Sequence, residues 1–146
     1  MIGCLRKLGR FFDPESQRAV ILPLDHGASD GLIPGVTTLP TLLKGLPGRR
    51  VQGVVLNKGI ARALGTLISP DMGMVVQLSG GTKHGLPTYN KSIVCTIPEA
   101  LRLGADMVAV QINIGNDLED RMLTDFGLIT DEAHQHGLPI MATVWP

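Results

Sequence analysis

The chain has 146 residues, and its 13 lysines and arginines balance 13 aspartates and glutamates, so the formal net charge at pH 7 is zero. This length corresponds to a single domain, residues 1–146, that can bury a sizeable hydrophobic core. Zero net charge provides no long-range attraction to nucleic acid or to an anionic membrane. One tyrosine, one tryptophan and three phenylalanines are too few for a base-stacking platform. We therefore expect partners that are neither nucleic acid nor membrane.

The cysteines and the first residues bear on the cellular compartment. Cys4 and Cys95 lie far apart and have no CxxC or metal-ligand spacing, so we expect free thiols, no metal and a reducing compartment; a disulfide is the alternative that sequence leaves open. The N-terminal sequence MIGCLRKLGRFF lacks the long apolar core of a signal peptide. No apolar run approaches the roughly 20 residues of a membrane span. These features predict a cytoplasmic protein.

Residues 1–18 are predicted to form an N-terminal helical segment. Its helix is expected over Met1–Phe12, with an apolar face made by Ile2, Leu5, Leu8 and Phe12. The remaining residues, 19–146, are predicted to alternate strands and helices.

The stretch Ala19–Gly27, AVILPLDHG, carries the first indication of a site. Its apolar run is typical of a strand buried on both faces, and it stops at Asp25 and His26. Ligands gather at the carboxyl ends of parallel strands, so a carboxylate and an imidazole there indicate a binding or catalytic site. The alternative is that Asp25 caps the following loop and His26 is only solvated. This stretch alone does not separate the two.

The rest of the chain repeats the same pattern. Further strands are predicted over Val51–Asn57, Met72–Leu78, Met107–Ile112 and Pro139–Val144, with a short one over Ser92–Cys95. Helices are predicted over Val36–Lys44, Ile60–Leu67, Ile97–Leu103 and Leu118–His136. Gly27–Gly35 is expected to be a loop, Ser79–Thr82 a polar strand end, and Lys83–Lys91 irregular.

Alternating strands and helices predict right-handed βαβ units and a parallel sheet. Polar or glycine-rich clusters follow the strands at Lys58, at Ser79 and at Asn113, which is the layout of a (β/α) barrel; a flavodoxin-like open sheet is the alternative. A complete barrel needs about eight βα units and around 250 residues. The fold class expected is therefore α/β, the N-terminal portion of a TIM barrel with about five βα units.

Several motifs in order resemble one enzyme family. They are RFFDPESQRAVILPLDHGASDG, VVLNKGIAR, VVQLSGGT, EALRLGAD, VQINIGN and LPIMATVWP. Together they resemble the class I aldolases of the DeoC/LacD type, which include the archaeal-type fructose-bisphosphate aldolases, and especially the 2-amino-3,7-dideoxy-D-threo-hept-6-ulosonate synthase branch. The resemblance implies an oligomeric TIM barrel that forms or cleaves sugar phosphates, such as fructose 1,6-bisphosphate, through a lysine Schiff base. It implies no metal and no cofactor.

The resemblance assigns roles to particular residues. Asp25 matches the family's catalytic aspartate, which moves protons at the substrate carbinol and carbonyl. His26, Lys58, Ser79 and Asn113 are expected to line the barrel mouth and bind substrate. The competing interpretations are an ion-paired or solvated Lys58 and simple strand-end turns at the other positions.

Two departures limit the resemblance. Trp145 stands where many members have an acid/base tyrosine; indole can position a substrate but cannot exchange a proton at useful pH. The resemblance also places the Schiff-base lysine and the phosphate-binding turns beyond the strand at Pro139–Val144. We therefore expect the 146-residue chain alone not to cleave fructose 1,6-bisphosphate.

Three functional hypotheses follow. The first is a Schiff-base aldolase or transaldolase-like enzyme of which this chain is a part. The second is a non-catalytic remnant that binds ligand or regulates. The third is a structural half-barrel that self-associates, since such a half exposes sheet edges and apolar surface, and a homo-oligomer is expected.

Overall fold

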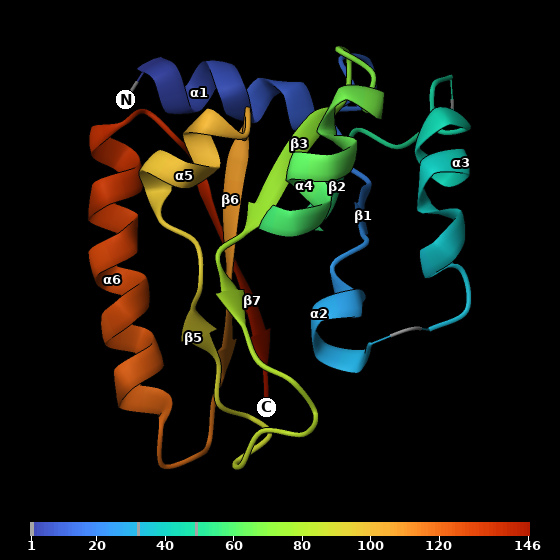
Figure 1. Cartoon of the computed structure of the whole chain (residues 1–146). Coiled ribbons are helices and arrows are strands. Elements are labelled where there is room, and N and C mark those ends of the chain that lie inside the picture. Colours follow the sequence, from blue (N-terminus) through green and yellow to red (C-terminus); the bar gives the residue numbers. More distant parts are fainter. Residues whose placement is uncertain (1, 32, 49) are drawn as a thin grey trace.

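The computed structural model describes residues 2–31, 33–48 and 50–146 of the chain. Five parallel strands form one curled sheet in the order β1-β2-β3-β6-β7 (Figure 1). The strands are β1 (Ile21–Pro23), β2 (Gly53–Asn57), β3 (Gly73–Gln77), β6 (Met107–Asn113) and β7 (Ile140–Trp145). The expected α/β architecture of a partial barrel is confirmed.

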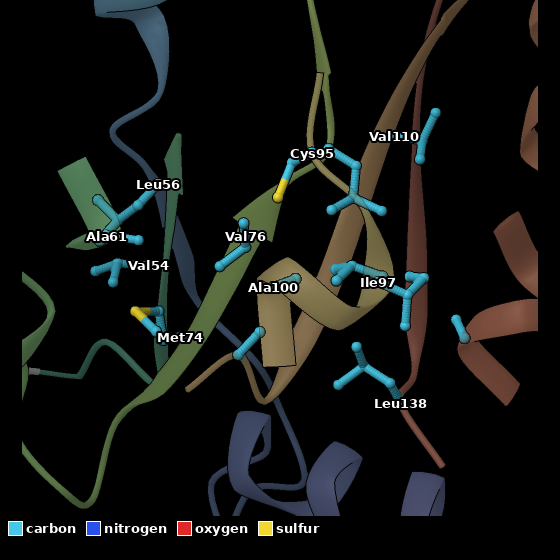
Figure 2. Packing of buried hydrophobic residues seen from close by; sticks show 14 of the residues in the cluster. Val54, Leu56, Ala61, Met74, Val76, Cys95, Ile97, Ala100, Val110 and Leu138 are labelled. Carbon is cyan, nitrogen blue, oxygen red and sulfur yellow. The ribbon is translucent and has the colours of Figure 1, made fainter. Parts of the chain in front are cut away.

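Helices cover the outer face of this sheet. Between the strands lie α2 (His26–Asp30), η2 (Val36–Thr38), α3 (Leu39–Lys44), α4 (Lys58–Leu64), η3 (Gly65–Leu67), α5 (Ile97–Arg102) and α6 (Glu119–Gln135). The main core lies between the sheet and the helices α3, α4, α5 and α6, where alternate strand residues such as Val54, Leu56 and Val76 meet Ala61 and Ala100 (Figure 2). No helix in the described ranges is both long and apolar enough to cross a membrane.

A second, smaller core fills the inner face of the sheet near its N-terminal end. The ring of Phe11 lies over Gly53 and Gly73, where an added Cβ would come within 2.7 Å and 2.4 Å of ring carbons. The segment that carries Phe11, α1 (Ile2–Leu8) and η1 (Gly9–Phe11), crosses this end of the sheet (Figure 1). Phe11 is therefore the side chain that closes the inner face at this end.

The predicted apolar face of the N-terminal helix is correct at Leu8, which packs against the small inner core, and wrong at Ile2, Leu5 and Phe12. Ile2 and Leu5 are 76% and 66% exposed, whereas Phe11, absent from the prediction, is 1% exposed. The physical reason is that the helix tightens into a 3-10 turn at Gly9–Phe11, which directs Phe11 rather than Phe12 toward the sheet. Met1, the first residue of the predicted helix, lies outside the described residues.

The first strand is shorter and less buried than predicted. The expected strand from Ala19 to Asp25 is reduced to β1, whose residues are half-buried or exposed, and Val20 just before it is 50% exposed. β1 lies at the edge of the sheet and pairs only with β2 among the described strands. Pro23 also lacks an N–H for the ladder, as is typical of edge strands.

Two further local predictions are corrected. The loop expected over Gly27–Gly35 begins with the helical turn α2, and Leu32 within it lies outside the described residues. The polar strand end at Ser79 is a short strand, β4 (Ser79–Gly80), paired antiparallel with β5 (Ser92–Ile93). The reason is that the carbonyl of Leu78 accepts the N–H groups of Val94 and Cys95, which brings the two segments together. Cys95 is buried, and both it and Cys4 are free thiols, as expected.

Candidate functional site

The inner face of the sheet changes from apolar to polar along the strands. On this face Val75 and Ala109 belong to the small inner core, whereas Gln77, Gln111 and Thr143 line a cavity nearer the carboxyl ends. The register pairs Gln77 with Ala109 and Gln111 with Thr143. Parallel strands thus place their polar side chains at one end of the sheet, where such folds carry ligand sites.

The cavity at this end has a volume of about 440 Å³. It is bordered by the two edge strands, by α2 and by the segment before β5. Its lining consists of Ile21, Pro23, Asp25, His26, Ser29, Val55, Gln77, Lys91, Gln111, Met141, Thr143 and Trp145. Three of the predicted site residues, Asp25, His26 and Trp145, therefore share one cavity although they come from opposite ends of the sequence.

Asp25 lies between β1 and α2 and is one of the residues that line this cavity. Its backbone serves the fold: the Asp25 carbonyl accepts hydrogen bonds from the Asn57 amide and, at 3.3 Å, from the Ala28 N–H. Its side chain occupies the N-cap position of α2 but makes no capping hydrogen bond. The alternative that Asp25 serves as a helix or loop cap is thus unsupported, and its carboxylate is available to a ligand.

Trp145, the last residue of β7, lies across the cavity from Asp25. Its side chain is 55% exposed. The indole N–H can donate one hydrogen bond but can accept none. Trp145 can therefore position a ligand in the cavity without acting as a proton carrier.

A second cavity of about 490 Å³ adjoins the first. Both cavities are lined by Lys91, Gln111 and Trp145, and the second also contains Asn113. Asn113 is buried, accepts a 3.0 Å hydrogen bond from the Gln111 amide and donates to the carbonyl of Tyr89. The two adjoining cavities, together called the groove below, lie at the carboxyl ends of β6 and β7.

Ser79 does not line either cavity. Its buried hydroxyl accepts a 3.0 Å hydrogen bond from the Gln77 side chain and a 2.8 Å hydrogen bond from the backbone N–H of Gln111. Gln77 and Gln111 both line the first cavity. Ser79 is accordingly a positioning residue, which holds the side-chain amide of Gln77 and the backbone of Gln111 and does not line the cavity itself.

Lys58 lies apart from both cavities. It is the first residue of α4 and forms a 3.2 Å ion pair with Glu99 on α5, which also pairs with Arg62 at 3.0 Å. The hydrogen bond from Lys58 lowers the pKa of Glu99 below its usual value. The alternative of an ion-paired lysine thus describes Lys58 in this structure, and its predicted role in substrate binding gains no support from its position.

Several lining residues escaped the sequence analysis. Gln77, Gln111 and Thr143 interrupt apolar strands at positions of the inner face, and the period-two alternation of a strand could have identified them. Lys91 gave no such indication because it lies at the end of an irregular segment. Within the described part of the chain, no group of three or more His, Cys, Asp or Glu side chains could hold a metal ion.

Comparison with known proteins identifies the family. A model of the DeoC/LacD family of aldolases matches residues 19–146. The chain belongs to this family. Its resemblance to the family, first inferred from sequence motifs, is thereby confirmed.

Two curated relatives are 30% and 28% identical to this chain over the aligned residues. A 2-amino-4,5-dihydroxy-6-oxo-7-(phosphonooxy)heptanoate synthase of Streptomyces griseus is 30% identical over 140 residues, which are 96% of this chain and 51% of the relative. A 2-amino-3,7-dideoxy-D-threo-hept-6-ulosonate synthase of Archaeoglobus fulgidus is 28% identical over 146 residues, all of this chain and 55% of the relative. The chain thus spans about half the length of the curated relatives it matches.

Solved structures agree with the fold. An archaeal fructose 1,6-bisphosphate aldolase superposes with a TM-score of 0.79 at 25% identity, covering 95% of this chain and 56% of that protein. Another structure of an archaeal fructose-1,6-bisphosphate aldolase, with its catalytic lysine covalently bound to the carbinolamine intermediate, superposes with a TM-score of 0.77 at the same identity and coverage. The five-stranded sheet therefore corresponds to a part of an aldolase-type barrel.

Proposed function

We propose that this chain supplies the Asp25-bearing part of an active site that makes or breaks a carbon–carbon bond in a sugar phosphate through a Schiff base. One observation carries the proposal: Asp25 lines a cavity at the carboxyl ends of the strands, and its side chain makes no capping hydrogen bond there. Family membership supplies the class of reaction. Homo-oligomerisation and a cytoplasmic location belong to the same proposal, the latter in keeping with two free thiols.

The chemistry requires a base at this place. A lysine amine condenses with the ketone of the substrate and releases water, giving an iminium ion. Removal of the proton from the substrate hydroxyl then lets the carbon–carbon bond break, and its electron pair moves toward the iminium nitrogen. We assign the proton transfer to Asp25, since a carboxylate within reach of the reacting hydroxyl can accept it. The amine is supplied, in this proposal, by a lysine outside these 146 residues.

The substrate class proposed is a phosphorylated keto sugar, with fructose 1,6-bisphosphate as the first candidate. The names of the relatives add a second candidate, a seven-carbon 2-amino keto acid, which in one of the two names carries a phosphate ester as its phosphonooxy group. Gln77, Gln111 and Thr143 line the cavity with hydrogen-bonding groups that suit the hydroxyls of either substrate.

The test uses the natural protein and borohydride reduction in the presence of dihydroxyacetone phosphate. We expect the intact mass to increase by one reduced ligand, with the modified lysine outside residues 1–146. Asp25→Asn should lower turnover at least about 100-fold, because it removes the base and preserves the shape of the side chain. Asp30→Asn is the matched control, since Asp30 lies on the same short helix and lines neither cavity. Absence of an adduct, or equal activity in the Asp25 and Asp30 variants, would refute the proposal.

A second candidate function is ligand binding without catalysis. Trp145, at the position of the family's acid/base tyrosine, favours it, because indole cannot exchange a proton at useful pH. Under this alternative the natural protein binds sugar phosphates but gains no mass on borohydride treatment. The trapping experiment therefore separates the two candidates.

A further inference from the structure

We propose that Lys91 forms an anion-binding subsite at the junction of the two cavities and that it binds the phosphoryl or carboxylate group of the ligand. The inference rests on the proposed function for the class of ligand, but its test requires no turnover. Four features of the structure support it: the anchored backbone of Lys91, its packed aliphatic stem, its unpartnered ammonium group and the distribution of charge along the groove.

The backbone of Lys91 is held in place by α6. The guanidinium of Arg121 donates a 2.8 Å hydrogen bond to the Lys91 carbonyl and a second one to the side chain of Asn90. Arg121 is itself paired with Asp125, one turn further along the helix, at 3.1 Å. The segment that carries Lys91 is therefore fixed against the end of the sheet.

The aliphatic stem of Lys91 is also packed. It lies against Gly81, where an added Cβ would come within 3.2 Å of the Lys91 Cδ and within 2.4 Å of the Asn90 carbonyl oxygen. The side chain is half-buried and lines both cavities. A lysine whose stem packs in this way loses less side-chain freedom when its ammonium group binds an anion.

The ammonium group of Lys91 is unpartnered. None of the ion pairs in residues 2–31, 33–48 and 50–146 includes it, and no hydrogen bond of the described residues uses it. Lys58 differs, because its ammonium group is engaged by Glu99. An ammonium group that is held in place, partly removed from water and without a counter-ion is expected to bind an anion from solution.

The charges along the groove indicate which of the two cavities the anionic group occupies. Asp25 lines the first cavity, whereas the described residues that line the second include no aspartate or glutamate. The second cavity is lined beside Lys91 by Thr88 and by Asn116, whose side-chain amide donates to the Asn113 carbonyl and accepts from the Leu118 N–H. An anionic group is repelled by Asp25 and attracted by Lys91, so it belongs in the second cavity, with the uncharged part of the ligand toward Asp25.

Trp145 allows a direct binding measurement. It is the only tryptophan of the chain and lines both cavities, so its fluorescence reports on occupancy of the groove. The ligands to titrate into the 146-residue chain are inorganic phosphate, glycerol 3-phosphate, glycolate and uncharged glycerol. We expect saturable quenching by the anions that weakens as salt is added, and none by glycerol at the same concentrations.

Three variants isolate the contribution of Lys91. Lys91→Gln keeps most of the stem and removes the charge, and it should weaken anion binding about tenfold. Lys91→Arg retains the charge and should stay within about threefold of the wild type. Lys83→Gln is the matched control, because it removes the same charge from the same connecting segment but lines neither cavity. Backbone amide NMR spectra of each variant verify that the fold is unchanged.

Each outcome of these titrations either supports or overturns the anion-binding subsite at Lys91. Loss of binding in Lys91→Gln alone supports the subsite, and a preference for glycerol 3-phosphate or for glycolate identifies the group as phosphoryl or carboxylate. Equal losses in Lys83→Gln and Lys91→Gln would mean attraction by bulk charge and would overturn the inference. Failure of every anion to quench the fluorescence of the wild type would also overturn the inference. Anion binding without any Schiff base would retain the subsite and refute only the proposed reaction.

Discussion

Individual residues of this chain behave according to the side chains that pack around them. Cys95 illustrates this: it is 2% exposed beneath α5, and burial, helped by the nearby charge of Glu99, raises the pKa of its thiol from 9.0 to about 11. The thiol is therefore held in its neutral form, which makes it a small apolar core residue rather than a nucleophile.

The raised pKa of Cys95 predicts a dependence of stability on pH. The folded state retains the thiol proton more tightly than the unfolded state, so this contribution is complete below pH 9.0 and is lost as the pH rises toward 11. The free energy of unfolding of the wild type should fall by up to about 3 kcal/mol more than that of Cys95→Ala over this interval. Urea unfolding at a series of pH values measures the free energy of unfolding of both proteins. Subtracting one from the other removes the contributions of the titrating groups that the two proteins share. Parallel curves for the two proteins would contradict the prediction.

At the scale of elements, side chains at particular positions determine how helices meet the sheet. The N-terminus of α5 begins with Thr96, whose hydroxyl accepts a 3.3 Å hydrogen bond from the N–H of Glu99, while Glu99 binds Lys58 and Arg62 of α4. One carboxylate thus joins two neighbouring helices on the outer face. On the inner face, the corresponding contact joins the ring of Phe11 to Gly53 and Gly73 of the sheet.

The contact of Phe11 with the sheet predicts the effect of a methyl group at Gly73. Gly73→Ala places a Cβ 2.4 Å from the Phe11 ring, so the ring must move out of a closely packed site. We expect a loss of about 1–3 kcal/mol in the free energy of unfolding, measured by urea denaturation. Gly59→Ala is the control, since Gly59 lies in α4 with no atom within 4 Å of its added Cβ. That variant should be neutral or slightly stabilised, and a similar loss in both variants would argue against the steric explanation.

At the scale of the whole molecule, the sheet has two outer strands that pair on one side only. β1 and β7 end the strand order of the described sheet, and Val144 and Trp145 of β7 are 54% and 55% exposed. Unpaired strand edges with exposed apolar side chains favour pairing with further polypeptide.

This arrangement predicts self-association through β7. Sedimentation velocity at rising concentration should show the 146-residue chain as a dimer or a larger species, and Val144→Lys should shift it toward monomer, because a charge opposes edge-to-edge pairing. Leu128→Lys is the matched control: Leu128 is 68% exposed but lies on α6, away from the sheet edge. A monomer at all concentrations, or dissociation caused only by the Leu128 variant, would contradict the prediction.

The sequence by itself determined the class of fold, the order of strands and helices, and the family. Apolar periodicity, glycine and proline positions, and the motif around Asp25 are local features, which a linear reading captures. The sequence patterns predicted the wrong burial where tertiary packing overrides the local pattern. In the N-terminal segment Phe11 rather than Phe12 is buried, and β1 is only half-buried because it lies at the edge of the sheet.

Only the tertiary structure decided which strand-end residues share a cavity. Asp25, Trp145 and Lys91 meet in the groove, whereas Lys58, also placed after a strand, begins a helix and binds Glu99 on the opposite face. The physical reason is that the face a side chain occupies depends on strand register and on the direction in which the following helix leaves the sheet. Those relations join residues far apart in the chain, such as Asp25 and Trp145, and no local pattern contains them.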